Sequence, residues 1–94
     1  MKYRTSAAQK SILAVLLMLE QANRPMPVPS FKIQGMINKS RSQEFQPHAF
    51  RGGVHKLNER GLIDVELNKS AKLDIKLTPN GREFAIPILE SMQH

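Results

Sequence analysis

Residues 57–63 read Leu-Asn-Glu-Arg-Gly-Leu-Ile, and this stretch decides the fold because it joins a helical pattern to a strand pattern. Leu57 is the last apolar residue of a helical spacing, and Gly61 suits the left-handed turn that often closes a helix. From Ile63 onward apolar and polar residues alternate, as they do along a half-buried strand. The sequence therefore predicts a helix that turns directly into a strand.

The helix on the N-terminal side of this turn is predicted to run from about Pro47 to Arg60. Its apolar side recurs at i, i+3, i+4 and i+7 and comprises Phe50, Gly53, Val54 and Leu57. Its polar side comprises His48, Arg51, Gly52, His55 and Glu59. A glycine inside a helix costs about 0.8–1 kcal/mol relative to alanine. We expect Gly53 to accommodate the bulk of Phe31 or Phe50, and a close approach of Gly52 to a ligand is the alternative.

An antiparallel hairpin and a last helix are predicted on the C-terminal side. Apolar and polar residues alternate in 63–67 and again in 73–77, and the short polar connector 68–72 suits a hairpin. Residues 77–82 read Leu-Thr-Pro-Asn-Gly-Arg, which ends the second strand. Thr78 can then cap a helix that extends to Met92 and is kinked at Pro87.

Two further helices are predicted before position 47. The first begins at Thr5 or Ser6 and ends before Arg24, and Leu13, Leu17 and Met18 widen its apolar stripe. This helix therefore either lies in the middle of the domain or contacts a second subunit. A proline-rich connector follows, with Val28 as a very short strand, and Ser30 caps a second helix. The inward positions of that helix are expected to be Phe31, Ile33, Met36 and Ile37.

Composition favours a polyanionic partner. The 94 residues suit a single domain over 1–94, with a net charge of +6. Residues 1–61 hold ten basic and three acidic side chains, whereas residues 62–94 hold four and five. The absence of cysteine excludes disulfide scaffolds and thiol catalysis. The longest apolar run, 12–19, is too short for a membrane span of roughly 20 residues, so we expect a cytoplasmic protein without membrane contact.

The order of elements and the two stretches at 57–63 and 77–82 resemble the winged helix-turn-helix superfamily of DNA-binding proteins. The first stretch is similar to its Leu-x-x-Arg-Gly-Leu-Ile junction, and the second is similar to the Leu-Thr-x-x-Gly-Arg of MarR-like and PadR-like bacterial regulators. The resemblance covers about residues 6–92. It implies a mainly helical α+β fold, in which a three-helix core carries a two-stranded antiparallel wing and a C-terminal helix.

This resemblance implies that the helix at 47–60 enters the major groove of double-stranded DNA while the wing contacts the neighbouring backbone. The DNA-binding residues that follow by position are Arg41, Ser42, Gln43, Gln46, His48, Arg51, Gly52, His55, Lys56, Lys69 and Lys72. Arg51 lies in the middle of the exposed side and can hydrogen-bond to guanine. Lys69 and Lys72 lie in the wing connector, where they suit either phosphate contact or solvation.

A homodimer is expected, because one short helix reads only half of a symmetric operator. The surplus apolar positions of the first and last helices supply a surface, and they comprise Leu13, Leu17, Met18, Phe84, Ile88, Leu89 and Met92. Packing of these residues against one another within one chain is the alternative. The function predicted is a small dimeric transcriptional regulator that represses by occluding its operator.

Other classes of function have less support. The sequence offers no phosphate-binding glycine loop after a strand and no obvious catalytic site, so we expect neither an enzyme nor a bound cofactor or metal. His48 and His55 would stand about 10 Å apart along a helix and could not share one metal. A winged-helix adaptor that binds protein, or an RNA-binding module, is the alternative. In so short a chain a small-molecule effector is expected only at a dimer seam.

Overall fold

The computed structural model describes residues 5–39, 47–70 and 72–92, and its elements follow the predicted order. They are α1 (Ala7–Gln21), β1 (Val28–Pro29), α2 (Ser30–Lys39), α3 (Pro47–Glu59), β2 (Ile63–Leu67), β3 (Leu73–Leu77) and α4 (Pro79–Met92). This is the α+β arrangement of a winged helix-turn-helix, mainly helical and with a β-hairpin wing. The predicted fold class is therefore confirmed.

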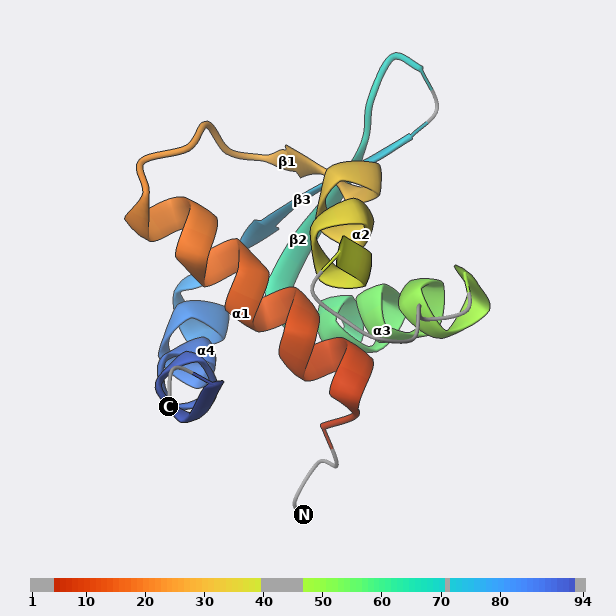
Figure 1. The fold of residues 1–94 in the computed structure, drawn as a ribbon. Helices are drawn as coiled ribbons and strands as arrows, with labels where there is room; N and C mark the ends of the chain where they lie inside the picture. Colours follow the sequence, from red (N-terminus) through yellow and green to blue (C-terminus); the bar gives the residue numbers. More distant parts are fainter. Residues whose placement is uncertain (1–4, 40–46, 71, 93–94) are drawn as a thin grey trace.

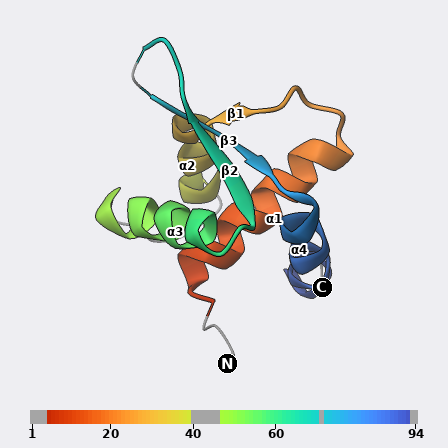
Figure 2. The same cartoon turned by 180° about the vertical axis from the view of Figure 1, so that it is seen from behind.

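The helix α1 is the centre of the molecule. It contacts α2, α3, α4 and β3, so neighbours cover it on several sides (Figure 1). In both views α3 and the loop of the wing extend toward the same side, with α2 between them, while α4 lies on the other side (Figure 2). The fold thus separates a side formed by α3 and the wing from a side formed by α1 and α4.

The sheet has three strands, which corrects the predicted two-stranded wing. Its order is β1-β3-β2, and both pairings are antiparallel. Val28 pairs with Ile75 and Pro29 with Asp74, so the proline-rich connector adds a short strand beside β3. Proline has no N–H to donate and is tolerated at a sheet edge, where β1 lies.

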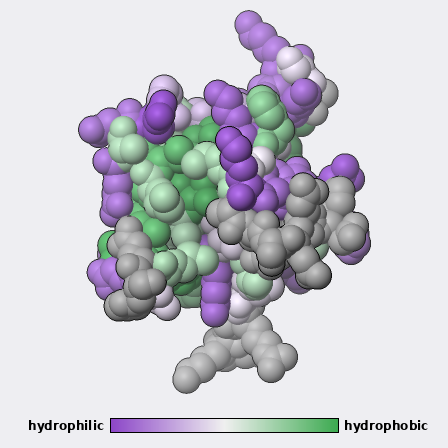
Figure 3. Space-filling view, in the orientation of Figure 1, coloured by the Kyte–Doolittle hydropathy of each residue, from purple (hydrophilic) through white to green (hydrophobic). Residues whose placement is uncertain are grey.

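The apolar stripe of α1 is wide because helices pack around it. Leu13 and Leu17 are buried in the core of the single chain, and so is Leu89 of α4. This outcome favours the alternative in which the first helix lies in the middle of the domain. Leu13, Leu17 and Leu89 were predicted to contact a second subunit, but they have almost no surface left for one. Apolar side chains that do remain accessible gather over α1 (Figure 3).

The inward face of α2 is narrower than predicted. Ile33 and Ile37, one turn apart, are buried against the core. Phe31 is 56% exposed and Met36 is 39% exposed, so the prediction that they point inward is wrong. A ten-residue helix that packs on one side buries only a single i, i+4 stripe.

The two stretches that define the fold in the sequence contact one another directly. The backbone turns at Gly61, whose φ of 72° lies in the left-handed region. The Thr78 hydroxyl donates a hydrogen bond to the Gly61 carbonyl (2.6 Å), and the Thr78 N–H donates to the Leu62 carbonyl (3.2 Å). Thr78 also caps α4, because its hydroxyl accepts from the Gly81 N–H at 3.0 Å. The end of α3 and the start of α4 therefore form a single unit.

Glycine is required at position 81 by close packing. A Cβ on Gly81 would lie 1.7 Å from the Leu62 carbonyl oxygen, which is backbone and has no freedom to move away. At Gly53 a Cβ would meet Ile12 Cδ1 at 3.2 Å and Ala8 Cβ at 3.4 Å. Gly53 thus allows α3 to approach α1, and the expectation that it accommodates Phe31 or Phe50 named the wrong neighbours.

Two arginines of the defining stretches connect elements that are distant in sequence. The Arg60 guanidinium donates to Gln9 Oε1 (3.0 Å) and lies 4.9 Å from the centroid of the Phe84 ring. Arg82 forms an ion pair and a hydrogen bond with Glu20, and this hydrogen bond, reinforced by the charge of Glu20, raises the pKa of Arg82. Both arginines hold helices together.

Candidate nucleic-acid interface

The exposed side of α3 carries the predicted contact residues of this helix. His48, Arg51, Gly52 and His55 are all exposed, and Lys56 is exposed beside them. They reach the surface because the opposite side, with Phe50, Val54 and Leu57, packs on the core. A second group of predicted residues, Arg41, Ser42, Gln43 and Gln46, lies outside the described residues.

Glu59 contacts two of these side chains from one helical turn further on. His55 Nε2 lies 3.0 Å from Glu59 Oε1, and Lys56 Nζ lies 3.8 Å from Glu59 Oε2. All three side chains are more than half exposed, so water screens both pairs and each contributes little to stability. Arg51 lies one turn before His55 and therefore about two turns from the Glu59 carboxylate.

Gly52 lies on the exposed side of α3 with open space around it. A Cβ built there would have no neighbour within 4 Å among the described residues. Packing among the described residues therefore does not require glycine at this position, in contrast to Gly53. The alternative that Gly52 allows close approach to a ligand remains a prediction.

Asn68 organises the turn of the wing. Its Oδ1 accepts hydrogen bonds from the Ser70 N–H (2.9 Å) and the Lys72 N–H (3.0 Å), and its Nδ2 donates to Asp74 Oδ1 at 3.1 Å. Asn is favoured in turns because its side chain can replace backbone partners in this way. Lys69 in this turn is exposed, and Figure 1 shows the loop of the wing on the same side of the molecule as α3.

Lys72 connects the wing to α2. Its Nζ lies 5.3 Å from the centroid of the Phe31 ring, within the distance of a cation–π contact. Phe31, which was predicted to be buried, instead stands at the surface beside the wing. The sequence predicts this ring inward because it is apolar, although its position two residues before Ile33 places Phe31 on another face of the helix.

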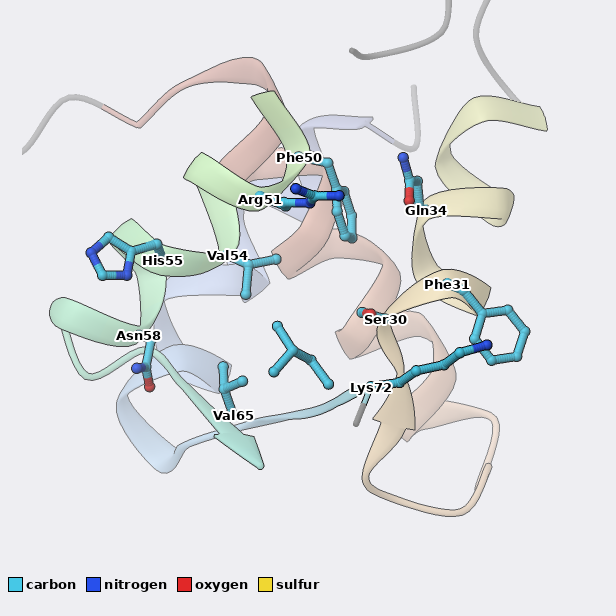
Figure 4. Close-up of a pocket in the computed structure, with 11 residues that line it drawn as sticks. Ser30, Phe31, Gln34, Phe50, Arg51, Val54, His55, Asn58, Val65 and Lys72 are labelled. Atoms are coloured by element: carbon cyan, nitrogen blue, oxygen red, sulfur yellow. The ribbon is translucent and has the colours of Figure 1, made fainter. Parts of the chain in front are cut away.

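A groove of about 560 Å³ lies between α2, α3 and the wing. Figure 4 shows Val54 pointing into it from α3 and Val65 from β2, while the Arg51 side chain extends over Phe50 toward Gln34. Lys72 runs along the opposite edge toward Phe31. The groove gave no signal in the sequence, because three elements form it that are far apart along the chain.

Two findings on the described residues concern a metal ion and a membrane. Within residues 5–39, 47–70 and 72–92, no three side chains of the metal-binding types are grouped to hold an ion. No helix there is sufficiently long and apolar to cross a membrane. Arg51 and Lys72 are the cations that line the groove, and His55 and Asn58 complete its polar edge.

Comparison with known proteins identifies the fold and not a family. No protein-family model matches the chain, and no curated protein matches its sequence. Among solved structures, F-93 of SSV1 has a TM-score of 0.72 and 13% identity, over 98% of this chain and 88% of F-93. A candidate DNA-binding protein of Ralstonia eutropha has a TM-score of 0.71 and 22% identity, over 88% of this chain and 95% of its own.

A third similar structure is MepR, described as a transcription regulator of the Staphylococcus aureus multidrug efflux pump MepA. Its TM-score is 0.65 at 16% identity, and the match covers 94% of this chain but 60% of MepR. At such low identities a common fold is all that similarity establishes. By its element order, its wing and these structural neighbours, the chain has the winged helix-turn-helix fold.

Proposed function

We propose that this protein is a transcriptional regulator that binds double-stranded DNA as a homodimer, with α3 in the major groove and the wing over the adjacent backbone. One observation carries the proposal. The helix α3 exposes Arg51, Lys56 and two histidines, and the loop of the wing, which extends toward the same side of the molecule as α3, carries exposed lysines. An α-helix fits the major groove, and lysine or arginine beside it can neutralise phosphates.

The structural neighbours give independent support. F-93, the Ralstonia protein and MepR share the fold, and the descriptions of the last two name DNA binding or transcription regulation. A fold by itself does not determine what a protein binds, so the proposal depends on the charged residues at this site. We infer repression by operator occlusion, since a bound dimer would cover the promoter that it overlaps.

Arg51→Ala is expected to weaken binding to duplex DNA about 10- to 100-fold, because a guanine or phosphate contact of arginine contributes roughly 1–3 kcal/mol. Fluorescence anisotropy with a labelled duplex measures this loss. The matched control is Arg24→Ala, which removes the same charge from an exposed arginine beyond the end of α1. Equal affinities of the two variants would contradict the predicted role of α3. Absence of binding at low salt in the wild type would instead favour a protein adaptor.

We propose that the two copies of the dimer meet through the side formed by α1 and α4. Met18 and Met92 are 48% and 51% exposed, and they line a hollow of about 240 Å³ with Val15 and Ala14. Phe84 and Ile88 extend this surface along α4 at intervals of one turn. The surface lies away from α3, so a dimer formed there would leave both α3 helices accessible.

Met18→Lys is expected to convert the dimer to a monomer, because a charge would be buried in an apolar interface. Light scattering on the eluting protein would report a mass that falls from twice 10.6 kDa to 10.6 kDa. The control is Leu67→Lys, which changes another exposed apolar side chain, 71% exposed, in the wing. A wild-type protein that is monomeric at all concentrations would refute this surface, and so would a dimer that survives Met18→Lys.

A further inference from the structure

A hollow of about 340 Å³ lies where the proline-rich connector meets α1 and α2, and we call it the connector hollow. Leu19 and Val28 line it as part of the core, so the packing of the single chain accounts for both. The rest of its apolar lining reaches the surface. Met36 is 39% exposed, and Pro25 is exposed beside it. These two side chains leave an apolar rim open to a further partner.

Two cations stand at the connector hollow. Arg24 comes from the connector and Lys32 from α2, and both are exposed. Neither forms an ion pair with another described residue, and none of the described residues that line the hollow carries a carboxylate. Glu20, the acid nearest to Arg24 in the sequence, is paired with Arg82. The hollow is therefore complementary to an apolar surface that bears carboxylates.

The outward face of α4 has this chemistry. Glu83, Ile86 and Glu90 recur at i, i+3 and i+7, on the side of the helix opposite the buried Ala85 and Leu89. Ile86 is 42% exposed, and neither glutamate forms an ion pair with another described residue. The residues of α4 proposed for the twofold dimer lie on a different face of this helix, so the outward face is left for another contact.

We propose that the outward face of α4 of one copy docks on the connector hollow of a second copy, so that its two glutamates face Arg24 and Lys32. The two surfaces differ from one another, and the contact is therefore head-to-tail and can continue beyond two copies. The connector and α4 both lie away from α3 (Figures 1 and 2). If α3 binds DNA as proposed, copies bound side by side would contact one another through these surfaces and bind cooperatively.

Reversal of the charges tests the contact. Arg24→Glu/Lys32→Glu makes the hollow negative, so it would repel the glutamates of α4. Glu83→Lys/Glu90→Lys makes the face of α4 positive, so it would repel an unchanged hollow. Each variant alone should self-associate about tenfold more weakly or less, because like charges would meet. Sedimentation velocity at low salt measures this, with Met18→Lys present in every protein to remove the proposed twofold dimer.

A mixture of the two charge-reversed proteins should associate again, because each reversed surface then meets its complement. Asp64→Lys/Glu66→Lys in β2 and Lys69→Glu/Lys72→Glu in the wing are the matched controls, and both should associate like the parent Met18→Lys protein. Circular dichroism verifies that every variant folds. The proposal is overturned if the parent stays monomeric at low salt, if the controls lose association equally, or if the mixture fails to restore it.

The cooperative step rests on the proposed function and has a separate readout. On a duplex long enough for several copies, binding of the wild type should rise more steeply with protein concentration than binding of either charge-reversed variant, and the mixture should be steep again. On a duplex that holds one dimer no neighbour is present, so Arg24→Ala should bind there like the wild type. Equal steepness throughout would overturn cooperativity. If the protein never binds DNA, sedimentation still decides whether the contact forms, so the two failures are distinguishable.

Discussion

Gly81→Ala is expected to unfold the protein or to leave it barely stable. The new methyl group would lie 1.7 Å from the Leu62 carbonyl oxygen, far inside van der Waals contact, and both groups are backbone or attached directly to it. Relief requires α4 to move away from the end of α3, which breaks the Thr78 hydrogen bonds to Gly61 and Leu62. The cost should exceed about 4 kcal/mol, a large share of the roughly 5–15 kcal/mol that stabilises a small domain. Urea unfolding followed by circular dichroism measures it.

The matched control is Gly35→Ala in α2. A Cβ at Gly35 meets nothing within 4 Å among the described residues, and alanine favours a helix over glycine by about 0.8–1 kcal/mol. This variant should therefore be slightly more stable than the wild type. The packing explanation for Gly81 would be wrong if both variants unfolded at the same urea concentration.

DNA affinity is expected to fall about 10⁴-fold between 50 and 200 mM salt. Among the described residues, each chain contributes four cations to the proposed interface, Arg51, Lys56, Lys69 and Lys72, and the proposed dimer therefore contributes eight. Neutralising that many phosphates releases condensed counterions, and the logarithm of the affinity then falls with the logarithm of salt with a slope of about −7. Anisotropy titrations with random-sequence duplex at several salt concentrations give this slope.

The double variant Lys69→Ala/Lys72→Ala measures how much of this salt dependence comes from contacts of the wing with the DNA backbone. It should reduce the magnitude of the slope by about one for each lysine removed in each chain. Arg24→Ala/Lys32→Ala removes the same charge from residues on another part of the surface, which line a separate hollow. Identical slopes for both doubles would mean that the wing does not contact the backbone, even if α3 does.

The elements of this fold were predictable where local pattern decides them. Alternation over 63–67 and 73–77 predicted both long strands, and the spacing of Phe50, Val54 and Leu57 predicted which side of α3 is buried. Thr78 was predicted as a helix cap, and its hydroxyl does accept from the N–H three residues on. These features depend on neighbours within one or two turns, so the sequence contains the information directly.

Features that depend on distant partners were not predictable. The pairing of Val28 with Ile75 needs the position of β3, and the contact of Arg60 with Gln9 spans 51 residues. Leu13 and Leu17 were ambiguous because an apolar residue on a central helix and one in a dimer interface look alike in sequence. The same distinction applies to the candidate site. The exposed side of α3 follows from local spacing and was predictable, whereas the groove beside it is formed by elements distant in sequence and was not.

The pairing of β3 on both edges has a mechanical consequence. At residues 74–75 the strand is held by β1 on one side and β2 on the other. β1 therefore anchors the hairpin close to its turn, whereas Lys76 and Leu77 at the far end of β3 pair with β2 alone. Because β1 runs directly into α2, this anchor fixes the distance between the wing and the helices, so in the proposed complex the wing and α3 would meet the duplex as one unit.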